Sequence, residues 1–214
     1  MVVVVPASTR AAAAAAAATL VLATTGCAGD SSDPVVAPVP AASGSSGAPG
    51  TTSAAVGPTY RADGLDLCGR TDVEALADLE LTVRRTDPSP PAGRPAAACL
   101  FEMRTKTGYE ANLRVEASTP ETVEEARQLY RGTRGATGMN PAGAVTGVGE
   151  EAEAFTKQST PGFKYAEYMV HARTGNLVVK VWLAVGGESY VPTSTLAAKA
   201  LAVVRATQSA VPTA

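Results

Sequence analysis

The chain has 214 residues, of which 45% are hydrophobic, and its 18 lysines and arginines against 20 aspartates and glutamates leave a net charge of −2. This length suits one domain with additional segments. Because the charge is almost balanced, the composition provides no basic surface for a phosphate backbone and argues against a nucleic-acid partner. One histidine and three widely spaced cysteines exclude a histidine-rich metal site and a CxxC pair.

The first 26 residues have the pattern of a secretory signal peptide. One positive residue, Arg10, precedes an apolar stretch over residues 11–22, and small residues follow it. The stretch is shorter than the roughly 20 residues of a membrane-spanning helix. An alanine-rich helix of a cytoplasmic domain is the alternative, but such a helix needs a polar face and this stretch has none.

Cys27 stands directly after this segment. The sequence GCAGD at residues 26–30 is similar to the lipobox of bacterial lipoproteins, in which the cysteine is acylated and becomes the first mature residue. The usual leucine three places earlier is replaced by Thr24. We therefore expect residues 1–26 to be a lipoprotein signal peptide and acyl chains on Cys27 to hold the protein on the outer face of the cell membrane. The alternative is an ordinary secreted protein cut nearby, with Cys27 removed or left as a free thiol.

A low-complexity segment follows the predicted anchor. Of the 33 residues from 28 to 60, 26 are alanine, glycine, serine, proline or threonine. Such a chain cannot bury enough apolar surface to offset its ordering entropy. We therefore expect residues 27–60 to be a lipidated cysteine with a disordered tether, and residues 61–214 to be a single domain.

Two further cysteines lie in the predicted domain. With Cys27 assigned to the lipid, Cys68 and Cys99 are the only remaining pair, and a disulfide is the default in an exported domain. A redox or nucleophilic Cys99 is the alternative. Its alanine, leucine and phenylalanine neighbours disfavour a reactive thiolate.

Three segments of the domain have helical periodicity. Thr71 and Glu74 have the spacing of a capping box and predict a short helix over residues 72–80. Thr119 and Pro120 predict the start of a second helix, which glycines at 132, 135 and 138 end. An amphipathic helix around residues 196–204 closes the chain.

Five segments are predicted strands. They are residues 98–103, 111–117, 151–157, 164–173 and 176–185, the last two joined as a hairpin around Gly175. Together with the helices they predict an α+β fold, an antiparallel sheet of about five strands with helices packed on one side.

The last predicted strand has two different faces. Its alternate residues 177, 179, 181, 183 and 185 are all leucine or valine and must face the core, whereas the other face mixes Val178 and Trp182 with Lys180. An aromatic beside a cation suits a partner surface, so we expect one around Trp182, Lys180 and Tyr168. The alternative is that a helix covers this face and Trp182 belongs to the core.

Motifs for catalysis and metal binding are weak. The GVG sequence at 147–149 lacks the third glycine of a dinucleotide loop and precedes a strand. His171 lies inside a predicted strand, where an exposed or hydrogen-bonded histidine is favoured over a serine triad. The acidic cluster of Glu150, Glu151 and Glu153 lacks EF-hand spacing and predicts a solvated turn. We expect no catalytic residue, no metal ligand and no cofactor, and thus no enzyme.

Three motifs together carry a family resemblance. They are LC at 67–68 before a short helix, ACLFE at 98–102 opening a strand, and GVGEEA at 147–152 before paired strands. With them, residues 64–208 resemble an actinobacterial lipoprotein family built on a domain of unknown function. That family is similar in plan to the extracellular sensor domains of some actinobacterial kinases and, more distantly, to the Mog1/PsbP-like fold. The resemblance implies the fold and the disulfide, but no catalytic residue.

These features favour a membrane-anchored extracytoplasmic lipoprotein that acts as a non-catalytic binding or sensing module. Its expected partner is another envelope protein or a wall component. The alternative is a carrier of an apolar ligand such as a lipid, which needs an internal aliphatic cavity. A binding module needs a closed core and an exposed patch. With only three phenylalanines and one tryptophan, the chain favours a closed core.

Overall fold

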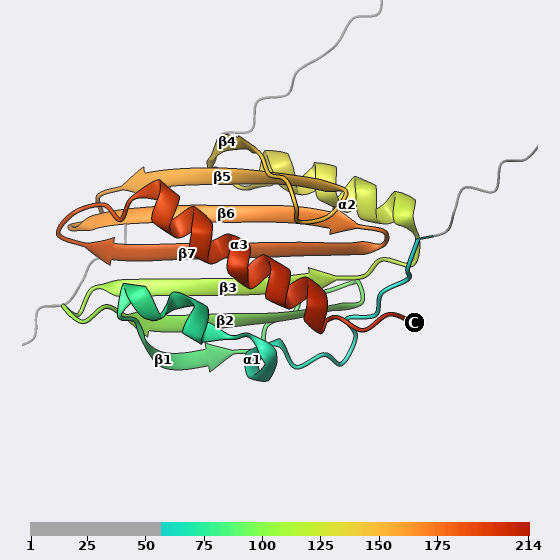
Figure 1. The fold of residues 1–214 in the computed structure, drawn as a ribbon, viewed down its shortest axis with the longest axis horizontal. Helices are drawn as coiled ribbons and strands as arrows, with labels where there is room; N and C mark the ends of the chain where they lie inside the picture. Colours follow the sequence, from blue (N-terminus) through green and yellow to red (C-terminus); the bar gives the residue numbers. More distant parts are fainter. Residues whose placement is uncertain (1–56) are drawn as a thin grey trace, which may run out of the picture. The chain divides into compact units, whose positions relative to one another are not determined.

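Seven strands form one antiparallel sheet in residues 57–214, the part of the chain that the computed structural model describes (Figure 1). Their order across the sheet is β1-β2-β3-β7-β6-β5-β4. Five of them match the predicted strands, so the α+β class and the antiparallel sheet are confirmed. The strands are β1 (Thr82–Asp87), β2 (Ala96–Arg104), β3 (Glu110–Ser118), β4 (Asn140–Ala144), β5 (Glu151–Ser159), β6 (Lys164–Thr174) and β7 (Leu177–Gly187).

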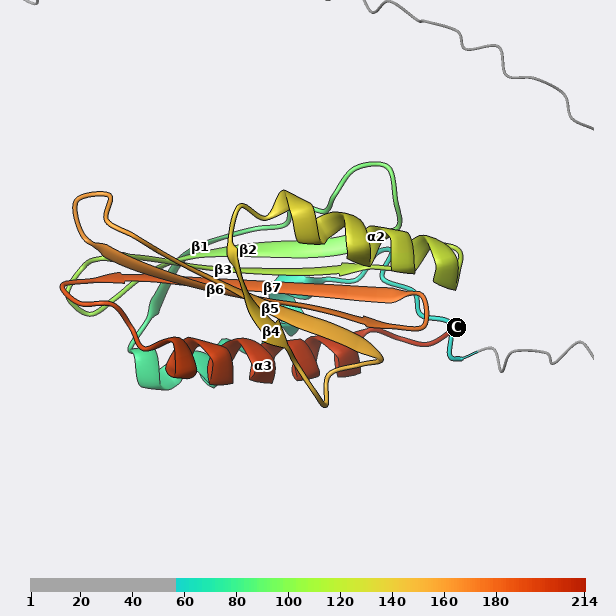
Figure 2. The same cartoon turned by 90° about the horizontal axis from the view of Figure 1, so that it is seen from above.

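Helices lie on both faces of this sheet, so the prediction that they pack on one side is wrong (Figure 2). One face carries α3 and the short helices near the start of the domain, and the other carries α2. The sheet supports two layers because both faces of β6 bury side chains, Tyr168 on the first and Met169 on the second. The helices are α1 (Leu67–Arg70), the 3-10 helix η1 (Val73–Leu79), α2 (Val123–Ala136) and α3 (Thr193–Ala210).

The core lies between the sheet and α3. Every second residue of β7 points into it and is at most 3% exposed: Leu177, Val179, Val181, Leu183 and Val185. The facing side of α3 contributes Leu196, Ala200, Val203 and Val204 to the same cluster. The strict alternation predicted for this strand therefore builds the core.

Two edge strands were missing from the sequence prediction, which is why the sheet has seven strands and not about five. In β1 the sequence TVRRTD has no apolar alternation, and five of its six residues are exposed. In β4 the sequence NPAGA contains proline and glycine, which are rare in strand interiors. Proline is tolerated at Pro141 because an edge strand has one side without ladder hydrogen bonds.

The starts of two helices differ from those predicted. Thr71 stands at the C-terminal end of α1, where its hydroxyl donates to the carbonyl of Leu67. The cap of η1 is Asp72. In α2 the capping box is formed by Thr122 and Glu125, three residues after the predicted start at Thr119. The glycines at 132 and 135 lie inside α2, because their backbone continues the helical hydrogen bonds.

The predicted disulfide is present. Cys68 of α1 is bonded to Cys99 of β2, with 5.1 Å between their Cα atoms. Cys99 is fully buried, and Leu67, which precedes Cys68 in α1, is 2% exposed. The bond therefore holds a four-residue helix, too short to be stable alone, against the core face of the sheet.

The chain enters the fold beside the turn between β6 and β7. The backbone N–H of Tyr60 donates to Oδ1 of Asn176 at 2.7 Å, and the Asn176 amide donates to the carbonyls of Tyr60 and Pro120. Tyr60 also bridges to Thr213 near the C-terminus. The fold therefore already includes Tyr60, the last residue of the predicted tether.

The predictions for the signal peptide, Cys27 and nearly all of the tether concern residues outside 57–214 and stay predictions. Within 57–214, none of the helices has the length and apolar character needed to cross a membrane.

We expect loss of the disulfide to destabilise the domain by about 3–4 kcal/mol, because the bond closes a 31-residue loop. Cys68→Ser removes the bond by changing the partly exposed cysteine, so the substitution leaves little cavity and adds little destabilisation of its own. Urea unfolding of wild type and variant without reductant measures the difference. Equal stabilities, or two free thiols in the native wild type by mass spectrometry, would contradict this.

Candidate functional site

The sheet face opposite the core is only partly covered by α2 (Figure 2). On this face α2 contacts β6 and β7. Trp182 of β7 stands near the middle of the face, between Arg114 of β3 and Met169 of β6. Its side chain is partly exposed, although α2 covers part of the same face.

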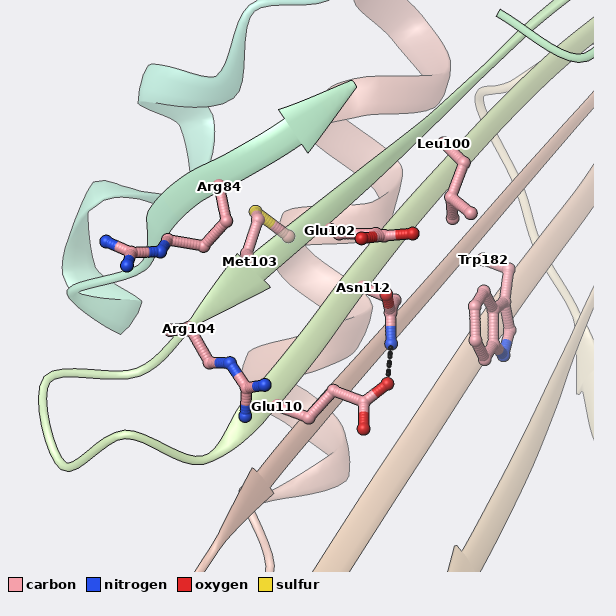
Figure 3. A pocket seen from close by; sticks show the side chains of 8 residues that line it. All are labelled: Arg84, Leu100, Glu102, Met103, Arg104, Glu110, Asn112 and Trp182. Carbon is pink, nitrogen blue, oxygen red and sulfur yellow. Dashed lines mark hydrogen bonds between the residues drawn. The ribbon is translucent and has the colours of Figure 1, made fainter. Parts of the chain in front are cut away.

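A depression of about 640 Å³ lies beside Trp182 and extends over β3 and β2 to β1 (Figure 3). Its walls are mainly polar, in contrast to the core face of the same strands. Eight residues line it: Arg84, Leu100, Glu102, Met103, Arg104, Glu110, Asn112 and Trp182.

The indole of Trp182 is held in place by a neighbouring strand. Its Nε1 donates a hydrogen bond to Glu167 Oε2 of β6 at 3.0 Å. Because β6 and the depression lie on opposite sides of β7, this bond turns the ring nitrogen away and leaves ring carbons on the depression side (Figure 3). Trp182 is thus a fixed aromatic wall.

Asn112 forms the second fixed element of the depression. Its side-chain amide donates to Glu110 Oε1 at 3.0 Å and to the Tyr165 hydroxyl at 3.1 Å. Asn112 is 8% exposed, so these two bonds satisfy a polar group that is otherwise nearly buried. Figure 3 shows the first of them at the edge of the depression.

On the α2 side of Trp182 a second depression, of about 420 Å³, is lined by Lys180, Arg114 and the end of α2. Both Lys180 and Arg114 pair with the Glu116 carboxylate, which is 7% exposed and also pairs with Arg94; the distances are 3.0 Å to Lys180, 3.6 Å to Arg114 and 3.3 Å to Arg94. The side chain of Lys180 is therefore tied to β3. Trp182 separates this depression from the first.

The three residues predicted as a partner surface are not all brought together. Trp182 and Lys180 lie on the sheet face opposite the core, and their role as a partner surface stays a prediction. Tyr168 is directly opposite Leu183 on the core face and is 6% exposed. Its assignment to this surface is wrong, since successive residues of β6 point to opposite faces.

His171 is neither exposed nor hydrogen-bonded through Nδ1 within the described part of the chain, contrary to the expectation from its strand. It is 1% exposed and its ring stacks on Tyr130 of α2, with centroids 4.7 Å apart. Burial, helped by the nearby charge of Lys180, lowers the pKa of His171 to about 4. The histidine is thus neutral at pH 7, and its ring packs the sheet against Tyr130 of α2.

The predicted solvated acidic turn is instead an ion-pair network. The buried guanidinium of Arg173 donates to Glu151 at 2.6 Å and to Glu150 at 2.7 Å. The pKa of Glu150 is lowered, first by the hydrogen bond from the backbone N–H of Gly175 and second by the hydrogen bond from Arg173. Glu153 pairs with Arg134 of α2 at 2.9 Å. The three carboxylates therefore neutralise arginines, and residues 57–214 contain no cluster of histidine, cysteine or acidic residues placed to hold a metal ion.

The glycine-rich turn before β5 needs a glycine at position 149. Its φ is +100°, and a Cβ atom there would lie 2.6 Å from the carbonyl oxygen of Arg173. The GVG sequence therefore serves close packing of the β4–β5 connection against β6.

Comparisons with known proteins add one structural neighbour. No protein-family model matches the sequence, and no curated protein matches it. The extracellular domain of PknH from Mycobacterium tuberculosis is similar over 67% of this chain and 92% of that domain, with 10% identity and a TM-score of 0.40. This neighbour is the extracellular domain of a kinase, which is one of the kinds of domain that the sequence resemblance named. Its identity and TM-score are too low to carry a conclusion about function.

We expect His171 to make stability fall as the pH is lowered. The unfolded chain protonates this histidine near pH 6.5 and the folded domain only near pH 4, so between these values the unfolded state binds more protons. From pH 7.5 to 5 the free energy of unfolding should fall by about 2 kcal/mol.

His171→Phe keeps the stacked ring without the titrating group and should remove most of this fall. Urea unfolding of both proteins at pH 7.5 and pH 5 provides the measurement. The chain has a single histidine, so no second imidazole contributes. The same loss in the variant and the wild type would show that His171 is not responsible.

Proposed function

We propose that this protein is a lipid-anchored binding module of the cell envelope, which recognises a ligand or partner without catalysis. The observation that carries this proposal is the open face around Trp182, where a fixed indole and a fixed amide stand beside a polar depression. Aromatic side chains held rigidly supply contact area at a low entropy cost, which suits recognition.

The disulfide supports a location outside the cytoplasm. The bond between Cys68 and Cys99 forms and persists in oxidising compartments. It agrees with the signal peptide and lipidated Cys27 predicted from the sequence, which would place the domain at the outer face of the membrane.

A binding role is favoured over a carrier role. The space between the sheet and α3 is filled by side chains such as Leu113, Val181 and Leu196, each at most 1% exposed. A lipid carrier would need an aliphatic cavity there. The depressions at Trp182 are on the other face and have charged walls.

A binding role is also favoured over catalysis. The single histidine is buried beneath Tyr130, where it cannot reach a substrate. The carboxylates of Glu150, Glu151 and Glu153 are paired with arginines, the first two with Arg173 and the third with Arg134.

We expect Cys27 to carry the membrane anchor. In a bacterial host, labelled palmitate should be incorporated into the wild type and lost in Cys27→Ala, because the acylated sulfur is removed. A variant labelled as strongly as the wild type, or wild type released into the medium, would refute the anchor.

We expect Trp182→Ala to lose a partner at the cell surface. Crosslinking on intact cells should give an adduct with the wild type and with Arg205→Ala, an exposed α3 variant on the other side of the sheet, but not with Trp182→Ala.

Thermal and urea unfolding must accompany this experiment. Because Trp182 is partly exposed, its truncation should cost less than the roughly 3–5 kcal/mol typical of a buried aromatic. An unchanged adduct in a folded Trp182→Ala protein would overturn the proposal for this face.

A further inference from the structure

We infer that the 640 Å³ depression beside Trp182 is a binding site for a neutral saccharide chain. The inference rests on the proposed binding function and adds the chemical class of the ligand. Saccharides present apolar C–H faces together with hydroxyl groups that both donate and accept hydrogen bonds. A site for them needs an aromatic wall, planar polar side chains and little net charge.

The aromatic wall is the indole of Trp182. Its hydrogen bond to Glu167 fixes the ring and uses its only polar atom, so the ring carbons on the depression side are left for an apolar ligand face (Figure 3). The electron-rich face of an indole attracts the weakly positive C–H groups of a sugar ring.

The polar side chains lie on neighbouring strands in fixed positions. Asn112 is held by Glu110 and Tyr165, and Arg104 is held by the carbonyl of Gly108 at 3.2 Å. Glu102 is half-exposed and opens onto the same space. The carboxylate oxygens and Oδ1 of Asn112 can accept from sugar hydroxyl groups, and the guanidinium of Arg104 can donate to them.

The charge of the depression favours a neutral ligand. Its walls contain two cations, Arg84 and Arg104, and two carboxylates, Glu102 and Glu110, which cancel. The second depression differs, because its walls contain two cations, Arg114 and Lys180, against the single carboxylate of Glu167. A phosphate or an acidic peptide would have no excess positive charge to bind beside Asn112.

The shape favours a chain over a single sugar. The depression extends from Trp182 across β3 and β2 to Arg84 of β1, which is an edge strand of the sheet. Several linked sugar units can therefore lie across the strands, and the chain can continue past the edge.

Trp182 is the single tryptophan of the protein, so its fluorescence reports on this site alone. The full-length wild type is titrated with four neutral tetrasaccharides: chitotetraose, cellotetraose, maltotetraose and mannotetraose. At least one should cause a saturable change in Trp182 emission. The Kd should rise about tenfold in Asn112→Ala and in Glu102→Ala, each of which removes hydrogen bonds.

Glu102→Ala should fold normally because the side chain of Glu102 is half-exposed, so a loss of binding in this variant is not due to misfolding. Glu74→Ala, on η1, is the matched control and should keep the wild-type Kd. Absence of saturable binding by all four sugars at millimolar concentration would overturn the inference. A wild-type Kd in both Asn112→Ala and Glu102→Ala would overturn it too. If the surface crosslink still depends on Trp182 in that case, the binding function stands and only the ligand class fails.

Discussion

The pairing of β7 with β3 on one side and β6 on the other is the constraint on which the whole domain depends. β7 is central in the sheet, and its residues 177–187 are paired along almost their entire length. A slip of one residue would turn the leucine and valine row away from α3 and expose it. The same register that buries Val181 also places Trp182 on the opposite face, so core and candidate site are fixed together.

The open face is organised as cross-strand rows because of this register. Glu153, His171, Lys180 and Glu116 are neighbours in one row, which α2 covers in part through Tyr130. The next row contains Met169, Trp182 and Arg114, where the cover of α2 ends. The groups of the buried first row are neutral or paired, whereas Trp182 and Arg114 of the second row are partly exposed to solvent. One sheet face therefore contains both a structural contact and the proposed recognition surface.

The sequence predicted the central strands and the disulfide because their signals are local. Alternation in 111–117 and 177–185 follows from burial of one face, and the cysteine pair follows from elimination. The edge strands β1 and β4 bury little and so carry no alternation. Periodicity predicts that α2 has an apolar side but not which sheet face receives it. Trp182 and Lys180 followed from alternation, whereas Asn112, Glu167 and the Arg173 network depend on register between distant strands.

The two ends of the sheet are suited to different tasks. The chain enters where Tyr60 is held by Asn176, next to the end of β3 at Ser118. The depression lies toward the start of β3 at Glu110, eight residues or about 27 Å away along an extended strand. An anchor at Cys27 would act on the first end. The candidate site lies toward the other end of β3 from the point where the chain enters, so a proposed tether that joins the domain at Tyr60 would leave the depression unobstructed.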